Sequence, residues 1–282
     1  MMNKNGKLYA KKSLGQNFLV NPRIAERIAQ NSVTEGCCGA LEIGAGRGIL
    51  TIALASCFEK VVAVEIDGDL IPELQANLAL KNVKNVTVVQ GDILKLDLHK
   101  LLETEFKGMN VVCVGNLPYY ITSPIVTKLL ESRLAVRSIV VMVQKEVAVR
   151  LCAPFKTPNI SAISFCIRYH SVPQLLFLVS NGNFRPIPKV DSAVVKFRIL
   201  ETPAVRISNP ALMFSLIKTG FSQRRKTLVN SLGKQLGLNK ANLEMILAEF
   251  GIQAQARAEE LSLADFAAIT AACYQSGLTL QH

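Results

Sequence analysis

Short apolar runs alternate with amphipathic stretches over residues 40–144, and no other feature limits the possible folds as strongly. The runs are rich in valine and isoleucine, which is typical of strands whose sheet is covered on both faces. There are five such runs, at residues 40–44, 60–66, 85–90, 110–115 and 138–144. Apolar residues recur at helical spacing in stretches near 49–57, 68–80 and 122–133. The alternation therefore predicts an α/β protein with a doubly wound parallel sheet.

The chain beyond this region changes its pattern twice. Two further apolar runs, around 160–169 and 192–199, could form an antiparallel pair that closes the sheet. After Asn209–Pro210 the apolar spacing becomes helical and strand-forming residues become few. We therefore expect a first domain over residues 1–200 and a small helical domain over residues 201–282.

Positive charge is concentrated in two places. The formal net charge is +11, and residues 1–27 and 218–234 together contribute +10 of it. Two interpretations stay open, namely solvated surface segments or an electrostatic footprint on phosphates, and the clustering favours phosphates. The residues expected to contact RNA are Lys11, Lys12, Arg224, Arg225 and Lys226.

Several classes of protein are disfavoured by what the sequence lacks. No apolar run approaches the roughly 18 residues of a membrane span, and the basic, polar first 12 residues do not resemble a secretory signal. The seven cysteines form no CxxC pair, and only three histidines occur, so we expect no metal site and no disulfide framework. We expect a monomeric cytoplasmic protein.

A glycine-rich loop follows the first predicted strand. Its sequence is Glu42-Ile43-Gly44-Ala45-Gly46-Arg47-Gly48, and glycines there allow a sharp turn and the close approach of a ligand. A dinucleotide fingerprint would place its third glycine where Ile49 stands. The loop therefore favours a cofactor without phosphates over a nicotinamide dinucleotide.

Acidic residues end the next two strands. Glu65 ends the second strand, where a carboxylate can accept hydrogen bonds from both hydroxyls of a ribose. Asp92 ends the third strand and could accept a bond from an adenine amino group. Either acid alone could equally be a helix cap or a solvated carboxylate. Together with the glycine loop they predict a nucleoside site at the carboxyl ends of the strands.

The segment Asn116-Leu117-Pro118-Tyr119 follows the fourth strand, beside the same crevice. The N6 amine of adenine is a poor nucleophile because its lone pair is delocalised into the ring. An asparagine oxygen and a backbone carbonyl, held by the fixed φ of proline, can accept both N–H bonds and direct that lone pair at a methyl group. Tyr119 can stack on the base. Catalysis is then mostly positioning.

These motifs, with four others, resemble the small-subunit ribosomal RNA adenine N6,N6-dimethyltransferases, the kasugamycin-sensitivity family, over nearly the whole chain. The matching segments are KKSLGQNFL (11–19), LEIGAGRGILT (41–51), VEID (64–67), GNLPYYI (115–121), VQKEVAVRL (143–151), FRPIPKVDSAVV (184–195) and FSQRRKTLVNSL (221–232). The resemblance implies a Rossmann-like class I methyltransferase sheet with a small C-terminal helical domain. It also implies S-adenosyl-L-methionine as the methyl donor and small-subunit rRNA, in the immature small ribosomal subunit, as the partner.

The resemblance further assigns roles to individual residues. It implies that Asn116, Leu117, Pro118, Tyr119 and Phe184 form the catalytic site, with Phe184 stacking opposite Tyr119. The implied cofactor contacts are Asn17, Leu19, Gly44, Gly46, Glu65, Ile66, Asp92, Ile93 and Asn116. The implied reaction dimethylates two adjacent adenines in a 3′-terminal hairpin loop.

Three other functions could be served by a chain with some of these motifs. A large-subunit rRNA adenine dimethyltransferase shares the fold and the catalytic motif, but the segments at 184–195 and 221–232 favour the small-subunit group. A non-catalytic ribosome-assembly factor is disfavoured because Glu65 and the segment Asn116 to Tyr119 are intact. A nicotinamide oxidoreductase is disfavoured by the glycine spacing.

Overall fold

The computed structural model describes residues 11, 14–236 and 239–275. Two compact units divide the chain: Met1–Ala148 with Val172–Ile199, and Val149–Ser171 with Leu200–His282. Residues 149–171 therefore group with the C-terminal helices, although they precede the boundary expected after residue 200.

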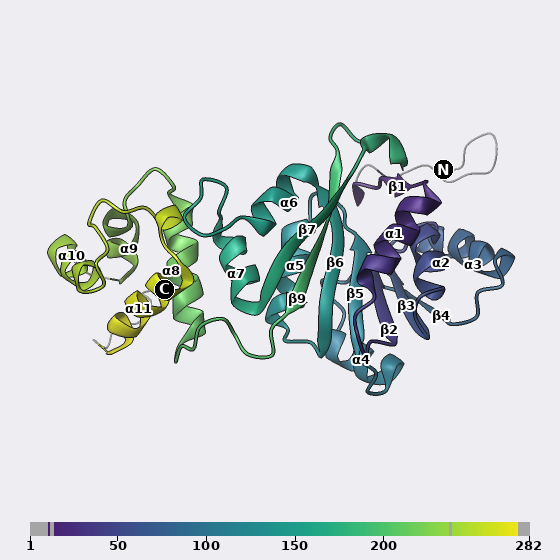
Figure 1. The fold of residues 1–282 in the computed structure, drawn as a ribbon, viewed down its shortest axis with the longest axis horizontal. Coiled ribbons are helices and arrows are strands. Elements are labelled where there is room, and N and C mark those ends of the chain that lie inside the picture. Colours follow the sequence, from purple (N-terminus) through teal and green to yellow (C-terminus); the bar gives the residue numbers. More distant parts are fainter. Residues whose placement is uncertain (1–10, 12–13, 237–238, 276–282) are drawn as a thin grey trace. The chain divides into compact units, whose positions relative to one another are not determined.

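The first unit is built on a seven-stranded sheet with the order β4-β3-β2-β5-β6-β9-β7 (Figure 1). The five strands predicted from the apolar runs are all present, and neighbours among them pair in parallel. They are β2 (Gly39–Ile43), β3 (Lys60–Glu65), β4 (Val86–Gln90), β5 (Val111–Asn116) and β6 (Val136–Gln144). The predicted doubly wound α/β sheet is confirmed.

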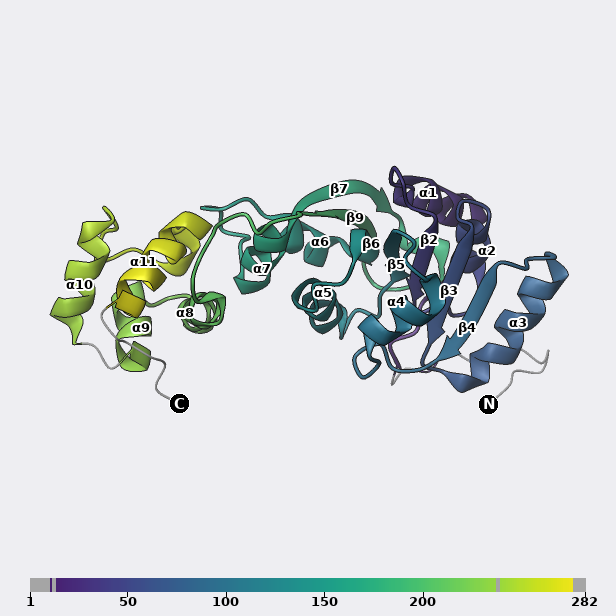
Figure 2. The ribbon, with the colours of Figure 1, turned by 90° about the horizontal axis from the view of Figure 1, so that it is seen from below.

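Helices cover both faces of this sheet. Figure 2 shows α1 and α2 on one face and α4 and α5 on the other. The helices of this unit are α1 (Pro22–Ser32), α2 (Ile49–Ala55), α3 (Ile71–Leu80), α4 (Leu98–Phe106) and α5 (Thr122–Glu131). Because both faces are covered, every residue of β2 is buried. This explains why the strands are continuous apolar runs.

The prediction of a strand at 160–169 is wrong, because this segment forms α7 (Ala162–His170). The backbone N–H of Ser161 donates to the Ser164 hydroxyl at 3.1 Å, which caps the first turn of the helix. The predicted antiparallel strand at 192–199 is confirmed as β9 (Ser192–Ile199), which pairs with β6. The strand next to β9 is β7 (Ser171–Val179), at the sheet edge, where Pro173 is tolerated.

Two short strands form a separate sheet in the first unit. β1 (Phe18–Leu19) pairs antiparallel with β8 (Phe184–Arg185), and Leu19 lies opposite Phe184. This pairing ties the segment that precedes α1 to the segment that precedes β9.

The second unit is helical, as expected for the chain after residue 209. Asn209 begins α8 by accepting a hydrogen bond from the Leu212 N–H at 2.9 Å, and Pro210 occupies the first turn. The helices that follow α6 (Lys145–Cys152) and α7 are α8 (Pro210–Ser222), α9 (Leu228–Leu236), α10 (Lys240–Glu249) and α11 (Leu263–Gln275).

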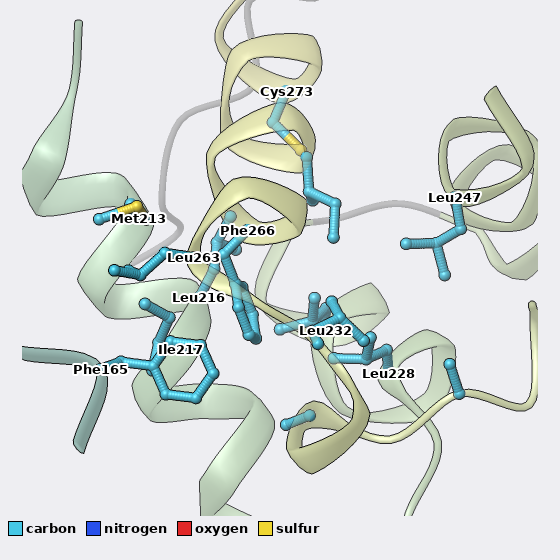
Figure 3. Packing of buried hydrophobic residues seen from close by; sticks show 14 of the residues in the cluster. Phe165, Met213, Leu216, Ile217, Leu228, Leu232, Leu247, Leu263, Phe266 and Cys273 are labelled. Carbon is cyan, nitrogen blue, oxygen red and sulfur yellow. The ribbon is translucent and has the colours of Figure 1, made fainter. Parts of the chain in front are cut away.

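Figure 3 shows the core of this helical unit, in which Phe165 of α7 lies among side chains of α8, α9 and α11. The Phe165 ring is fully buried and contacts Phe155, Phe221 and Phe266 at centroid distances of 5.1, 5.5 and 5.3 Å. A residue that precedes β7 in the chain is thus central to the C-terminal helical core.

Phe165→Ala should therefore lower the free energy of unfolding by about 3–5 kcal/mol, because it removes a buried ring and leaves a cavity. Urea-induced unfolding measures the change. Phe250→Ala is the matched control: Phe250 belongs to the same unit but is 40% exposed, and its replacement should cost much less. Equal losses for the two variants would contradict the assignment of Phe165 to this core.

Candidate functional site

The parallel register of three central strands brings the predicted site residues to one level. Ile43 of β2 pairs with Val64 of β3 and with Gly115 of β5. The next residues are Gly44, which directly follows β2, and Glu65 and Asn116, the last residues of β3 and β5, so these three lie at the same edge of the sheet. A cavity that opens to solvent lies there, with about 540 Å³ of empty space when the open solvent is included. It is lined by Leu14, Gly15, Gln16, Asn17, Phe18, Gly44, Gly46, Glu65, Ile66, Leu70, Asn116, Leu117, Pro118 and Tyr119.

The glycine loop adopts backbone conformations that favour glycine. Gly44 has φ +76° and Gly46 has φ +56°. The Gly44 N–H donates to the Val64 carbonyl at 2.9 Å, which continues the sheet into the loop. A Cβ on Gly46 would lie 3.3 Å from the Phe18 ring, so a side chain there would crowd the segment that precedes α1.

Glu65 fastens the glycine loop to the end of β3. Its carboxylate accepts from the Gly46 N–H at 2.7 Å and from the Asp67 N–H at 2.8 Å. Burial raises the pKa of Glu65, and these two backbone donors partly offset that effect. Each carboxylate oxygen keeps a further lone pair for a ligand, and the neighbouring Ile66 side chain is 47% exposed at the cavity wall.

The residues predicted at the end of β4 lie outside this cavity lining. Asp92 accepts a hydrogen bond from the Leu94 N–H at 2.9 Å and lies 3.9 Å from the Lys95 ammonium. Ile93 is buried. The assignment of both residues to the cofactor site stays a prediction.

Asn116 is oriented by the segment that precedes α1. Its Nδ2 donates to the Asn17 carbonyl at 3.1 Å. The Oδ1 atom accepts no hydrogen bond from any residue that the structure describes. The Pro118 carbonyl accepts from the Ile121 N–H at 3.2 Å and from the Thr122 hydroxyl at 3.1 Å. A hydrogen-bond acceptor that the protein leaves open is thus present at the cavity wall.

The two aromatic residues predicted to hold the target base differ in exposure. Tyr119 lines the cavity, and its hydroxyl lies 3.1 Å from the Ser192 hydroxyl. Burial raises the pKa of Tyr119, and this hydrogen bond partly offsets that effect. Phe184 is fully buried in the apolar cluster that includes Leu19 and Ile28. Stacking of a base on Phe184 would require its ring to move, and that role stays a prediction.

A hydrogen-bonded network that sequence reasoning missed joins the N-terminal segment to the residues that follow β3. The Lys11 ammonium donates to Asp67 at 2.6 Å and to Asp69 at 2.7 Å, and Gln16 Nε2 donates to Asp67 at 2.8 Å. Burial alone would raise the pKa of Asp67, but Lys11 and Gln16 hold it below its usual value. No short-range signal connects residues 56 positions apart. Lys11 is thus engaged within the protein, and its predicted contact with RNA stays a prediction.

The other predicted RNA contacts differ in whether the protein itself engages their side chains. The Arg224 guanidinium donates to the Pro158 carbonyl at 2.8 Å and to Glu259 at 3.0 Å, so it cross-links the helical unit. Arg225 and Lys226 are exposed, and within the described part of the chain neither side chain forms an ion pair. Lys12 lies outside the described residues.

A second residue missed by the sequence analysis is Glu42, in the middle of the buried strand β2. Neither carboxylate oxygen has a hydrogen-bond partner in the structure. Burial raises the pKa of Glu42 to about 8; the nearby Thr51 hydroxyl lowers it, and the Glu65 charge raises it. A pKa in this range favours the protonated carboxyl at neutral pH. The sequence analysis gave Glu42 no role of its own, because it lies within the apolar run at residues 40–44.

The described residues contain no group of three or more histidine, cysteine, aspartate or glutamate side chains placed to hold a metal ion. No described helix is long and apolar enough to cross a membrane.

Comparison with known proteins gives matches over nearly the whole chain. The sequence matches the family described as ribosomal RNA adenine dimethylase over residues 7–274. It is 44% identical to the ribosomal RNA small subunit methyltransferase A of Alkaliphilus oremlandii over 257 residues, which is 90% of this chain and 88% of that protein. It is 42% identical over 264 residues to the protein of the same name in Bacillus mycoides, covering 92% of this chain and 90% of that one.

Solved structures resemble the fold over similar lengths. A dimethyladenosine transferase from Plasmodium falciparum superposes with a TM-score of 0.76 at 26% identity, covering 93% of this chain and 98% of that chain. The 23S rRNA methyltransferase ErmE superposes with a TM-score of 0.69 at 24% identity, covering 90% and 98%. At this identity the likeness to ErmE concerns the fold alone.

Glu42→Gln should stabilise the ligand-free protein in a pH-dependent manner. The pKa of Glu42 is about 8 in the folded chain and near 4.5 when unfolded, so between these values the folded state holds a proton that the unfolded state releases. As the pH rises between these two pKa values, the free energy of unfolding of the wild type should therefore fall relative to that of the glutamine variant, by about 1.4 kcal/mol per pH unit. Urea unfolding at pH 5, 6.5 and 8 measures the difference, and a constant difference would contradict the buried neutral carboxyl.

Proposed function

The chain belongs to the ribosomal RNA adenine dimethylase family, and we propose that it methylates the N6 amines of two adjacent adenines in a 3′-terminal hairpin loop of small-subunit rRNA. It is an rRNA adenine dimethyltransferase. We further propose S-adenosyl-L-methionine as the methyl donor, the immature small ribosomal subunit in the cytoplasm as the substrate particle, and a monomer as the active form. The relatives named as small subunit methyltransferases, at 42–44% identity, support the choice of subunit.

The observation that carries the proposal is the meeting of Gly44, Glu65 and Asn116 at one level of three neighbouring strands, around one cavity. The described residues that line this cavity include a carboxylate and no lysine or arginine, which suits a cationic sulfonium better than a pyrophosphate. Glu65 would accept hydrogen bonds from the ribose hydroxyls, and Ile66 offers apolar surface beside it. When bound, S-adenosylmethionine supplies an electrophilic methyl group.

The protein's part in the reaction is to orient the target amine. The open Oδ1 of Asn116 accepts one N–H of adenine N6. The Leu117 carbonyl is the second acceptor, because the Pro118 carbonyl is already bonded within the turn. With both N–H bonds held, the nitrogen lone pair would be directed at the methyl group that bound S-adenosylmethionine would supply, and the electron pair of the methyl–sulfur bond would stay on sulfur. The nitrogen then loses a proton to water, and the step occurs twice per adenine.

Tyr119 would hold the base by stacking. Its hydroxyl is anchored at Ser192, so the ring is fixed at the cavity wall rather than free to turn. Phe184 would complete the stack only after leaving its buried position.

Two rival functions make different predictions. Large-subunit rRNA would be modified by an enzyme with the same fold, and the fold alone does not distinguish the two substrates. A non-catalytic assembly factor would bind the particle without methylating it. Incubation with labelled S-adenosylmethionine and unmethylated small or large subunits, followed by mapping of the modified nucleotides, separates all three. Label confined to large subunits, or no label despite tight binding, would overturn the proposal.

Asn116→Ala should reduce the single-turnover methyl-transfer rate on small subunits by on the order of 100- to 1000-fold with both ligands saturating, because it removes a preorganised acceptor. RNA affinity should change little, since phosphate contacts supply most of it. Asn242→Ala, at an exposed position of α10, is the matched control and should leave the rate unchanged. A wild-type rate in Asn116→Ala would contradict the mechanism.

Replacement of both Arg225 and Lys226 by alanine should weaken RNA binding. It should also reduce the slope of log affinity against log salt concentration by about 0.7–0.9 per lost phosphate contact. Arg224 is left intact because it is bonded to Glu259. Binding titrations at several salt concentrations measure the slope. Lys81 and Lys84, two exposed lysines near the end of α3, provide a double-alanine control with the same charge change. Identical slopes for wild type and the Arg225/Lys226 variant would show that these two side chains are solvated and do not contact phosphates.

A further inference from the structure

We propose that Tyr120 stacks on the RNA base next to the target adenine, and so holds the strand while Tyr119 holds the target itself. The inference rests on the proposed function, because it takes the substrate to be a polynucleotide with its target base in the cavity. It adds a substrate contact outside the cavity, at a residue that belongs to neither the predicted catalytic site nor the basic clusters.

The first observation is the exposure of the Tyr120 side chain, which is 57%. Among the aromatic side chains that the structure describes in the first unit, no other is exposed: Phe18 and Tyr119 are half-buried and the rest, Phe184 included, are buried. The Tyr120 hydroxyl forms no hydrogen bond with any described residue. A flat apolar ring is thus left open to a partner.

The second observation is the position of this ring beside the cavity. A Cβ on Gly15 would lie 3.0 Å from Cδ1 of Tyr120, and Gly15 lines the cavity. Because Gly15 has φ +58° and no side chain, one edge of the ring rests directly against the backbone there. Tyr120 itself does not line the cavity, although Tyr119 does. The ring therefore lies next to the space that the target base would occupy, and outside it.

The third observation is that Tyr119 and Tyr120 reach different segments from one turn. The Tyr119 hydroxyl lies 3.1 Å from that of Ser192, at the start of β9. The Tyr120 ring contacts Gly15, in the segment that is hydrogen-bonded to Asp67 beyond β3. In the order of the sheet, β5 lies between β3 and β9. The two rings therefore diverge, and they offer separate surfaces to two bases.

This position selects a strand of RNA as the partner. A base held in the cavity is joined through its ribose to neighbours that must leave the cavity at its opening. Every base has a flat π face, so stacking on an aromatic ring does not depend on which base the neighbour is. A free nucleoside confined to the cavity would contact Tyr119 without reaching Tyr120. Tyr120 thus favours a target base that is part of a chain.

A purely structural role for Tyr120 makes a different prediction. In that case the ring only supports the segment before α1 through its contact with Gly15. Cofactor affinity would then depend on Tyr120, because residues 14–18 line the cavity. Stacking instead makes the use of RNA depend on Tyr120 when the cofactor is saturating.

The experiment is a double-mutant cycle between the protein and the RNA. Small subunits are reconstituted with rRNA whose 3′-terminal hairpin is synthetic. Methyl transfer is followed at one adenine, and the nucleotide on one side of it or on the other is made abasic. The value of kcat/KM is measured for each subunit with the full chain at saturating S-adenosylmethionine.

Tyr120→Ala should lower kcat/KM on unaltered hairpins by about 5- to 30-fold, within the range for one base stacked on an aromatic ring. An abasic nucleotide at the stacked position should cost wild type a similar factor and should cost Tyr120→Ala nothing further. Tyr120→Phe keeps the ring face and should match wild type. Tyr120→Leu keeps apolar bulk against Gly15 without a π face, and should lose as much as the alanine variant.

Tyr274→Ala is the matched control, because Tyr274 is a tyrosine of the helical unit with a similar exposure of 55%. It should leave kcat/KM unchanged. Calorimetry with S-adenosylhomocysteine should give the same affinity for wild type, Tyr120→Ala and Tyr120→Leu. That result also shows that the variants are folded and that their loss is not transmitted through Gly15.

Each other outcome overturns one of the two proposals. If Tyr120→Ala loses the same factor whichever neighbour is abasic, or if cofactor affinity falls with the ring, Tyr120 does not stack on the strand. If wild type transfers no methyl group to subunits with the unaltered hairpin, the proposed function is wrong instead.

Discussion

Parallel pairing of β2 with β3 and β5 is the constraint on which the site depends. Adjacent parallel strands end at the same edge of a sheet, so residues far apart in the chain arrive together once the register is set. Here the register puts Gly44, Glu65 and Asn116 one step beyond paired residues. The Glu65 carboxylate then fastens the glycine loop through the Gly46 N–H, and Asn116 is turned by the Asn17 carbonyl. The relative positions of these candidate site residues are thus set first by the register of the sheet.

Sequence reasoning succeeded where the signal was local. The valine-rich runs specified five strands, because burial on both faces imposes a continuous apolar pattern, and the predicted residues Gly44, Glu65 and Asn116 lie together at the ends of β2, β3 and β5. It failed where the answer depended on distant contacts. Apolar residues at 160–169 fit a strand or a buried helix equally well. The hydrogen-bonded cap at Ser161 favours the helix that the structure shows. The burial of Phe184 and the pairing of Lys11 with Asp67 depend on partners more than fifty positions away.

The charge distribution of the site follows from burial rather than from residue counts. Although the net charge is +11, the described residues that line the candidate cavity include one carboxylate, Glu65, and no lysine or arginine, while exposed cations such as Arg225 lie in the helical unit. The proposed cationic donor and the proposed RNA contact would therefore use differently charged parts of the molecule. Burial is the largest cause of the raised pKa values of Glu42 and Glu65, and a neighbouring carboxylate adds to it in each case, Glu65 at Glu42 and Asp67 at Glu65.

The helical unit is assembled from two pieces of chain, 149–171 and 200–282, with β7, β8 and β9 between them. Its core needs both pieces, because Phe165 comes from the first and its partners Phe221 and Phe266 from the second. A protein cut after residue 200 would leave the second piece with its central aromatic ring missing. The helical unit therefore cannot be exchanged between proteins as one contiguous C-terminal segment. In evolutionary terms, a recombination that transplants the helical unit must carry the last strands of the sheet with it.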